Sequence, residues 1–422
     1  MIRYDKNSLK AEEFINDGEI LDSLKFADEN KNNLELVDKI IEKARLKKGI
    51  NHREASVLLA CEDKERIEEI YSLARQIKKD FYGDRIVMFA PLYLSNYCVN
   101  GCVYCPYHAK NKHICRKKLT QDEVRKEVIA LQDMGHKRLA IEAGEDPVNN
   151  PIEYILDCIK TIYSVNHRNG AIRRVNVNIA ATTVENYKKL KEAGIGTYIL
   201  FQETYNKKSY EQLHPTGPKH NYNYHTEAMD RAMQGGIDDV GIGVLFGLEL
   251  YRYELAGLLM HAEHLEAVHG VGPHTISVPR IKAADDINPD DFDNGIDDET
   301  FAKIVAIIRI AVPYTGMIIS TRESESVRKK VLELGISQIS SPADAPAPAR
   351  DDGGTGQLFF AHACASFQLV RKASSSSAVS TAVQWTSAPS VFFTKPLRAL
   401  PGPTSRMSVT PSSPRRRRVS SM

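Results

Sequence analysis

Residues 95–107 read SNYCVNGCVYCPY and hold three cysteines, Cys98, Cys102 and Cys105, in the spacing C-x3-C-x2-C. The apolar run Ile86 to Leu94 directly before them predicts a buried strand, so the cysteines are expected on the loop that leaves its C-terminal end. Cysteine thiolates are the usual ligands of iron–sulfur clusters, which normally take four. Three clustered cysteines therefore predict a [4Fe-4S] cluster with one open iron, and an open coordination position is typical of a metal site that does chemistry.

A structural zinc site is the alternative for the same cysteines. His108 and His113 follow closely, but zinc sites usually pair two C-x2-C units, and the sequence has no second unit. The four other cysteines are scattered along the chain: Cys61, Cys115, Cys158 and Cys364. Cys61 and Cys158 stand in helical, apolar patterns, which predict buried thiols. The single unit of three therefore favours the cluster.

The composition of the 422-residue chain is typical of a globular protein, and its formal net charge of +2 does not indicate a nucleic-acid partner. The chain shows neither an apolar run of about eighteen residues nor a signal-peptide pattern, so no membrane span is expected. Seven cysteines, an odd number, argue against a disulfide framework. A reducing compartment, the cytoplasm, is therefore expected.

Two patterns divide the first 340 residues. Residues 1–85 carry apolar side chains at helical spacing and predict an N-terminal helical extension, either a cap on the next domain or an independent partner-binding module. Residues 86–340 alternate short apolar strands with amphipathic helices, which indicates parallel strands. The expected strands are 86–94, 138–141, 175–180, 197–201, 240–246, 275–278, 316–320 and 337–340, with helices such as 225–234 and 250–268 between them. Eight such repeats predict a (β/α)8 TIM-type barrel.

Polar residues follow several of these strands, where barrel chemistry takes place. After the second strand Gly144 precedes Glu145, and this pair suits either a ligand with a cationic group or a plain acidic turn. Glu203 follows the fourth strand. On the expected helix 250–268, His261 and His264 are three apart, which favours a partly exposed helix face over a metal pair.

Two arginines end later strands. Arg280 follows the sixth strand, which contains Ser277, and Arg322 follows the seventh. An arginine at a barrel mouth suits a substrate carboxylate through a bidentate pair. The alternative for each is a salt bridge to a neighbouring acid such as Glu323.

The cysteine spacing, with Tyr104 before the last cysteine, resembles the signature of radical S-adenosylmethionine (SAM) enzymes. The resemblance implies that the open iron chelates the amino and carboxylate groups of SAM. Ala143-Gly144-Glu145 is similar to the GGE motif of that family, which implies contact with the SAM amino group.

A second segment carries the same resemblance. Residues 243–249, GVLFGLE, are similar to the family's G-x-I-x-G-x-x-E segment near adenine, with the acid one residue early. This implies a cofactor contact at Gly247. It also implies that Glu203 contacts the SAM ribose or amine and that Arg231 pairs with the SAM carboxylate.

Four longer runs make the resemblance closer, namely 93–98, 201–206, 214–219 and 318–323. Together they look like the tyrosine lyases of the radical SAM family. Residues 1–340 look more like the [FeFe]-hydrogenase H-cluster maturase than like its thiazole-pathway relative.

This closer resemblance implies cleavage of L-tyrosine at Cα–Cβ to p-cresol and dehydroglycine (2-iminoacetate). The candidate substrate residues remain those at the strand ends, Ser277, Arg280 and Arg322. The resemblance further implies a ferredoxin or flavodoxin as electron donor and hydrogenase maturation proteins as partners. The alternatives are the thiazole-pathway 2-iminoacetate synthase and a non-catalytic zinc- or cluster-binding protein.

Residues 341–422 differ from the rest of the chain. They lack Ile, Asn, Tyr and Glu and contain ten Lys and Arg against three Asp. Residues 1–340, in contrast, contain 46 Lys and Arg against 51 Asp and Glu. This low-complexity composition predicts disorder. In the maturase that the chain resembles, a C-terminal domain binds a second cluster and makes CO and cyanide, but only Cys364 stands here. We hypothesise a shift of reading frame near Ser341, with CO and cyanide formation lost.

Overall fold

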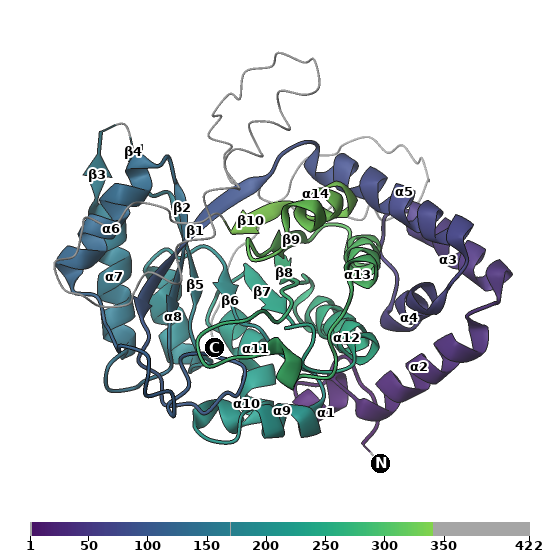
Figure 1. Ribbon diagram of the computed structural model, residues 1–422, viewed down its shortest axis with the longest axis horizontal. Helices are drawn as coiled ribbons and strands as arrows, with labels where there is room; N and C mark the ends of the chain where they lie inside the picture. The colour runs from purple at the N-terminus through teal and green to yellow at the C-terminus, as the bar shows by residue number, and fades with distance from the viewer. Residues whose placement is uncertain (1, 169, 341–422) are drawn as a thin grey trace, which may run out of the picture. The chain divides into compact units, whose positions relative to one another are not determined.

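Eight parallel strands close into a barrel at the centre of the described chain (Figure 1). The computed structural model describes residues 2–168 and 170–340. The barrel strands are β1 (Val87–Ser95), β2 (Arg138–Ala143), β5 (Arg174–Asn178), β6 (Tyr198–Ile199), β7 (Val240–Gly243), β8 (Thr275–Ser277), β9 (Gly316–Ile319) and β10 (Gln338–Ser340). Each pairs with the next along the chain, and β10 returns to pair with β1. The predicted (β/α)8 barrel is confirmed, while the hypotheses about residues 341–422 lie outside the described residues.

Helices cover the outside of the barrel (Figure 1). Those of the barrel are α6 (Gln121–Asp133), α7 (Ile152–Ser164), α8 (Val184–Glu192), α9 (Lys207–Leu213), α10 (Tyr222–Thr226), α11 (Ala228–Gln234), α12 (Tyr251–His269), α13 (Asp298–Ala311) and α14 (Glu325–Leu334). Polar caps fix where several of them begin. Thr120 and Glu123 form a reciprocal capping box at α6, a device that stabilises a helix by about 1 kcal/mol.

Before the barrel come the helices α1 (Ala11–Phe14), α2 (Asp17–Asn30), α3 (Leu34–Arg45), α4 (His52–Ala60) and α5 (Lys64–Tyr82). Within the barrel sequence, β3 (Asn166–His167) and β4 (Gly170–Ala171) form a small antiparallel pair between α7 and β5. Helices α2, α4 and α5 pack on α12, α13 and α14, and their apolar side chains belong to the same hydrophobic core as the barrel. This packing agrees with a cap on the barrel, although the domain boundary at residue 85 stays a prediction.

A buried histidine ties this extension to the barrel. His52 at the start of α4 lies between Glu263 of α12 and Glu19 of α2, with ring nitrogens 3.1 Å from a carboxylate oxygen of each. The backbone N–H of His52 also donates to Glu263 at 2.7 Å. The ring therefore bridges two carboxylates that come from different parts of the fold.

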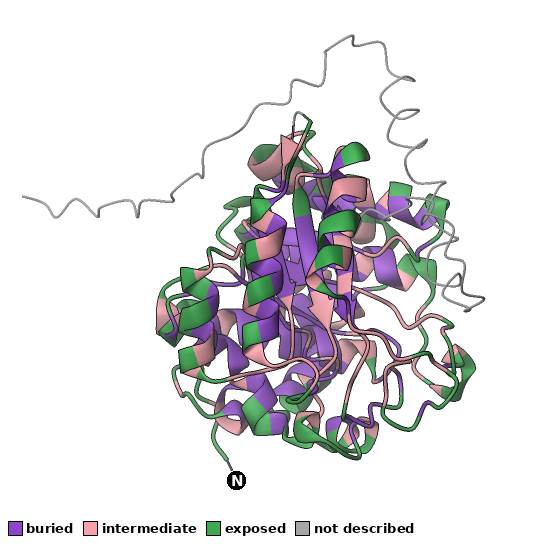
Figure 2. Ribbon diagram, turned by 90° about the vertical axis from the view of Figure 1, so that its left-hand side faces the viewer, coloured by how far each residue is buried: buried purple, intermediate pink, exposed green. Residues whose placement is uncertain are grey.

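The barrel interior and the helix faces that cover it are buried, while the outward helix faces are exposed (Figure 2). Phe89 of β1, Ala140 of β2 and Ile318 of β9 form a small separate apolar cluster. The outer core lies between strands and helices, where β-branched and leucine side chains are fully covered. This double burial explains why the strands read as continuous apolar runs.

Three local predictions need correction. The fourth and fifth strands are shorter than predicted, because beyond Ile199 and Gly243 the neighbouring segments meet only in isolated parallel bridges, Glu203 with Val244 and Phe246 with Arg280. The helix expected over 225–234 is broken at Glu227 into α10 and α11. The expectation that His261 and His264 lie on a partly exposed face is wrong, since both are buried, and His264 pairs with Asp230 at 3.0 Å.

Arg309 of α13 is fully buried, and within residues 2–168 and 170–340 no carboxylate pairs with it. Its guanidinium donates to the carbonyl oxygens of Pro313 and Thr315 at 2.9 and 2.8 Å, and to that of Gly335 at 2.7 Å. Burial lowers the pKa of Arg309 to about 10. One side chain thereby satisfies the carbonyls that precede β9 and β10.

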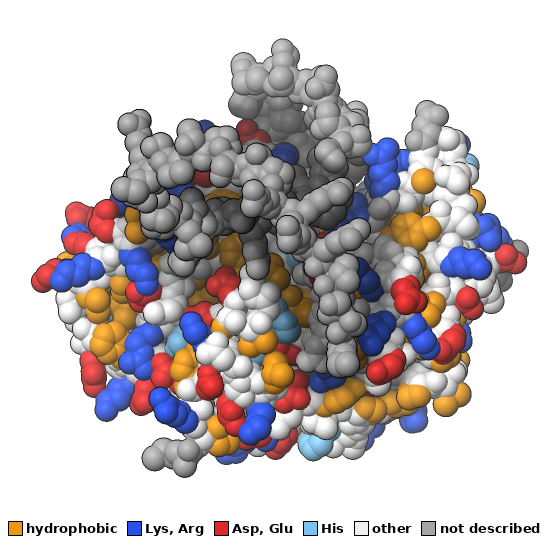
Figure 3. All heavy atoms as spheres, turned by 180° about the vertical axis from the view of Figure 1, so that it is seen from behind, with side chains coloured by type: hydrophobic (Ala, Val, Ile, Leu, Met, Phe, Trp, Pro, Cys, Tyr) orange, Lys and Arg blue, Asp and Glu red, His pale blue; other side chains and the backbone are white. Residues whose placement is uncertain are grey.

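Within residues 2–168 and 170–340, no helix is long and apolar enough to cross a membrane. The face seen in Figure 3 shows acidic and basic side chains interspersed over the described surface.

Candidate functional site

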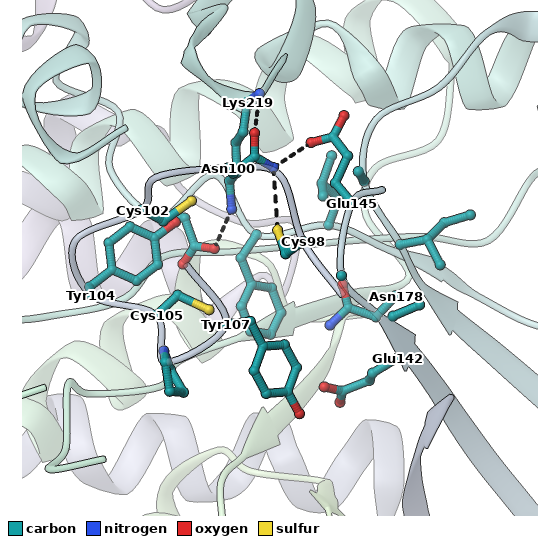
Figure 4. A pocket seen from close by; sticks show the side chains of 18 of the residues that line it. Cys98, Asn100, Cys102, Tyr104, Cys105, Tyr107, Glu142, Glu145, Asn178 and Lys219 are labelled. Atoms are coloured by element: carbon teal, nitrogen blue, oxygen red, sulfur yellow. Dashed lines mark hydrogen bonds and ion pairs between the residues drawn. The ribbon is translucent and has the colours of Figure 1, made fainter. Parts of the chain in front are cut away.

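A cavity of about 270 Å³ opens where the strands end. Residues in or just after five of the strands line it: Tyr93 of β1, Glu142 of β2, Asn178 of β5, Phe201 after β6 and Arg322 after β9. The cysteine loop that follows β1 lies over the same cavity (Figure 4). This is the end of a parallel barrel at which active sites are found.

Cys98, Cys102 and Cys105 all line this cavity, and Figure 4 shows their sulfur atoms facing a common space. Burial raises the pKa of Cys102 to about 11 and that of Cys105 to about 12. Thiolates in such a setting need nearby positive charge, which bound iron supplies as it displaces the protons. The donor set of three thiols therefore fits a [4Fe-4S] cluster that keeps one iron open.

The residues of 213–219 support the cysteine loop from the side. The N–H groups of Gly101 and Val103 donate to the carbonyls of Thr216 and Leu213 at 2.9 and 3.0 Å. Gly217 has a φ of +93°, and a Cβ there would lie 2.3 Å from Asn100 Oδ1. Only glycine therefore allows this close approach.

Tyr104 joins the same support through His214. Its hydroxyl lies 2.6 Å from His214 Nε2, while His214 Nδ1 lies 2.7 Å from the carbonyl oxygen of Tyr210. Burial, reinforced by the charge of Lys219, lowers the pKa of His214 to about 3. The neutral ring thus donates to Tyr210 and accepts from Tyr104.

Gly144 and Glu145 lie beside the first cysteine. A Cβ on Gly144 would lie 2.4 Å from the carbonyl oxygen of Tyr97 and 2.9 Å from Cys98 Cβ, so the absence of a side chain brings β2 against the cysteine loop. Asn100 Nδ2 donates to Glu145 Oε2 at 2.7 Å and approaches Cys98 Sγ at 3.7 Å. Burial raises the pKa of Glu145, although Asn100 and Lys219 act in the opposite direction.

Glu203 and Lys219 form a partly buried ion pair at the cavity, with Nζ 2.9 Å from Oε1. Glu203 has a φ of +69°, which is strained for a residue with a side chain. Glu254 of α12 holds the neighbouring loop, because it accepts from the Thr204 hydroxyl at 2.5 Å and from the Tyr205 N–H at 2.9 Å. With its backbone held in this way, Glu203 lines the cavity.

Glu142, Tyr93 and Arg322 form the far end of the cavity. Burial raises the pKa of Glu142 to about 7, against the lowering effect of the Arg322 charge. Glu142 in turn raises the pKa of Tyr93. This end thus offers one cation and one carboxyl group that titrates near neutrality.

Other predicted residues lie elsewhere. In the described part of the chain, the cavity lining does not include Ser277, Arg280, Arg231 or Gly247. Arg280 is engaged by Glu323 and Asp298, as the salt-bridge alternative predicts, and Arg231 donates to the carbonyls of Thr182 and Tyr224. Gly247 has a φ of +110° and approaches Ile281, and Ser277 is buried in β8.

Among the lining residues to which the sequence interpretation gave no role are four polar ones that the geometry brings into the site: Asn100, Glu142, Asn178 and Lys219. Lys219 stands in the run 214–219, which the sequence singled out without giving it a role. Asn100 stands between two cysteines, which was an available signal.

Comparison with known proteins covers most of the chain. Residues 92–259 match the Radical SAM superfamily, and residues 277–372 match the Biotin and Thiamin Synthesis associated domain. The chain is 60% identical to the crystal structure of HydG, a maturase of the [FeFe]-hydrogenase, with a TM-score of 0.76 over 78% of this chain and 72% of that one. HydG from Carboxydothermus hydrogenoformans is 38% identical, with a TM-score of 0.75 over 86% and 84% of the two chains.

Among curated proteins, the 2-iminoacetate synthase of Salmonella typhimurium is 26% identical over 71% of this chain and 78% of its own length. The structural likeness, the high identity to a solved HydG and the superfamily match agree with one another. The chain therefore belongs to the radical SAM superfamily, whose enzymes use a [4Fe-4S] cluster and SAM, and within it to the HydG family.

Proposed function

We propose that this enzyme cleaves the Cα–Cβ bond of L-tyrosine to give p-cresol and dehydroglycine, in maturation of the [FeFe]-hydrogenase. The 60% identity to a HydG maturase supports the proposal. The observation that carries it is one cavity that joins the three cysteines to Arg322 and Glu142.

Cys98, Cys102 and Cys105 hold the cluster in this proposal, with Tyr104 fixing the last turn of the loop. When bound, the cluster and SAM together supply a 5′-deoxyadenosyl radical that abstracts hydrogen. Glu145, oriented by Asn100, takes the SAM amino group.

The far end of the cavity suits an α-amino acid. Arg322 pairs with the substrate carboxylate, and Glu142 takes its ammonium group, so that each charge meets one of opposite sign. Tyr93, Tyr107 and Phe201 line the same cavity and offer aromatic contacts for a phenol ring.

The partner proteins follow from the same proposal. The reaction needs a low-potential one-electron donor such as ferredoxin or flavodoxin, and its product passes to other hydrogenase maturation proteins. CO and cyanide formation is absent in this proposal, because residues 341–422 hold only Cys364 and one cysteine does not build a second cluster.

The decisive experiment is anaerobic reconstitution with iron and sulfide, followed by incubation with SAM, dithionite and tyrosine. We expect p-cresol and 5′-deoxyadenosine in stoichiometric amounts. Formation of 5′-deoxyadenosine without p-cresol would contradict tyrosine as the substrate.

The thiazole-pathway 2-iminoacetate synthase is the second candidate, since such enzymes are relatives at 26% identity. It shares the chemistry and differs in the pathway that uses the product. Complementation separates the two, because a thiazole-pathway enzyme restores growth to a strain that lacks its own 2-iminoacetate synthase.

A further inference from the structure

We infer that the partly buried ion pair of Lys219 and Glu203 sets the reduction potential of the cluster, with Lys219 raising it and Glu203 lowering it. The inference rests on the cluster ligands of the proposed function, Cys98, Cys102 and Cys105. It gives these two side chains an electrostatic role that is separate from binding SAM.

Both residues line the same cavity as the cysteines. Figure 4 shows Lys219 beside the cysteine loop. The side chains of Lys219 and Glu203 are only 16% and 12% exposed, and Lys219 Nζ lies 5.7 Å from the centre of the Tyr104 ring. Lys219 and Cys102 line the same cavity, and the Asn100 side chain that accepts from the Lys219 N–H also approaches Cys98 Sγ at 3.7 Å. The lysine therefore lies within the surroundings of the proposed cluster ligands.

The backbone holds both members of the pair in place. The N–H of Lys219 donates to Asn100 Oδ1 at 3.0 Å, so the lysine is attached to the cysteine loop itself. The Glu203 carbonyl accepts from the Leu245 N–H at 3.0 Å, while Glu254 fixes the two residues that follow Glu203. Neither charge is on a flexible surface side chain.

Charge then decides the direction of each effect. A [4Fe-4S] core with three thiolates carries about −1 when oxidised and −2 after one electron from a low-potential reductant, and net charge is one determinant of its potential. A fixed cation favours the added electron, and a fixed carboxylate opposes it. Both effects persist at a site that is mostly shielded from solvent, because dissolved salt screens the charges there only weakly.

The test uses three variants of the full chain: Lys219→Met, Glu203→Gln and the double variant. Each is reconstituted anaerobically without SAM and titrated potentiometrically, with the reduced cluster followed by EPR. We expect the potential to fall in Lys219→Met and to rise in Glu203→Gln. Each shift should be at least about tenfold in the reduction equilibrium constant, or about 59 mV for one electron. The double variant should return close to wild type.

A matched control is Lys207→Met, because Lys207 pairs with Glu12 and is not a lining residue of the cavity in the described chain. Its potential should equal that of the wild type. Shifts of the same sign in the two single variants, or no shift in either, would overturn the inference, since a merely structural role gives no opposite signs.

Cluster content separates the possible failures. If the wild type holds no iron and sulfide, the proposed cluster ligands fail and the inference fails with them. If every variant holds a cluster whose reduction potential equals that of the wild type, only the inference fails and the proposed function stands. If Lys219→Met loses its cluster, Glu203→Gln still decides, because a zero or negative shift there is incompatible with the role of the pair.

Discussion

Asn100 brings together groups that the sequence leaves apart, since its side chain contacts Glu145, Cys98 and the backbone of Lys219. At this scale, single substitutions separate metal ligands from cofactor contacts. Each of the single substitutions Cys98→Ala, Cys102→Ala and Cys105→Ala should abolish the cluster that binds SAM, because the two remaining thiolates leave two irons without a protein ligand. EPR of the reduced protein with and without SAM checks this, and an unchanged SAM-sensitive signal in any one variant refutes it.

Glu145→Ala should weaken SAM binding by roughly 10–100-fold, the loss expected for a hydrogen bond to a charged group, while iron content stays near wild type. Equilibrium binding of SAM and iron per chain are the two measurements. Glu153→Ala is the control, since Glu153 pairs with Lys189 on the helical surface. Parallel loss of iron would argue against a contact to SAM.

Glu142 predicts a pH dependence. Its pKa is raised to about 7, so the carboxylate is charged above that pH and neutral below it. The KM for tyrosine should therefore rise as the pH falls below about 7, approaching tenfold per pH unit, because the substrate ammonium loses its partner. In Glu142→Gln the KM should be high at every pH. A wild-type KM that stays level from pH 6 to 8 would exclude this role.

The sequence predicted those site residues that share a short motif. The cysteines and Gly144-Glu145 lie at fixed spacings on loops whose strands are easily recognised. Lys219 was missed because it reaches the cavity only through tertiary contacts of residues 213–219 with the cysteine loop. Arg280 and Arg322 have equivalent places in the sequence, and only the neighbours Glu323 and Asp298 show that the first is already engaged.

At the scale of elements, the residues of 213–219 and the cysteine loop act as one unit. Gly217→Ala should lower the free energy of unfolding by about 1–3 kcal/mol and reduce the iron bound per chain, because its Cβ would meet Asn100. Gly135→Ala is a matched control, since φ is +92° there against +93° and a Cβ would meet nothing within 4 Å. Thermal unfolding and iron assays compare them. Equal iron content in the two variants would contradict the prediction, because the contact at residue 217 would then not support cluster binding.

Element boundaries were predicted best where apolar patterns are long, as in β1 and α12, and worst at the mouth. Tyr198–Ile199 and Val240–Gly243 end early although apolar residues continue, because the following residues pair with their neighbours only in isolated bridges, Glu203 with Val244 and Phe246 with Arg280. Periodicity reports burial and does not distinguish burial in a sheet from burial beneath a loop.

For the whole molecule, we predict a separation of two activities. The protein should release p-cresol from tyrosine while forming no iron-bound CO or cyanide, since residues 341–422 contain a single cysteine. Chromatography detects the first product, and infrared spectroscopy of the reacted protein detects the second. Infrared bands of CO and cyanide on iron, or a second cluster by iron counting, would contradict the prediction.

The pairing of β1 with β10 has a consequence for biosynthesis. Val87 finds its partner Gln338 only after most of the chain has been translated, which at about 5–20 residues per second takes roughly 12–50 s. The partners of the cysteine loop in 213–219 leave the ribosome much earlier. The nascent chain therefore has the supports of its metal loop before the ring of strands closes, while the free edge of β1 remains available to chaperones or to aggregation.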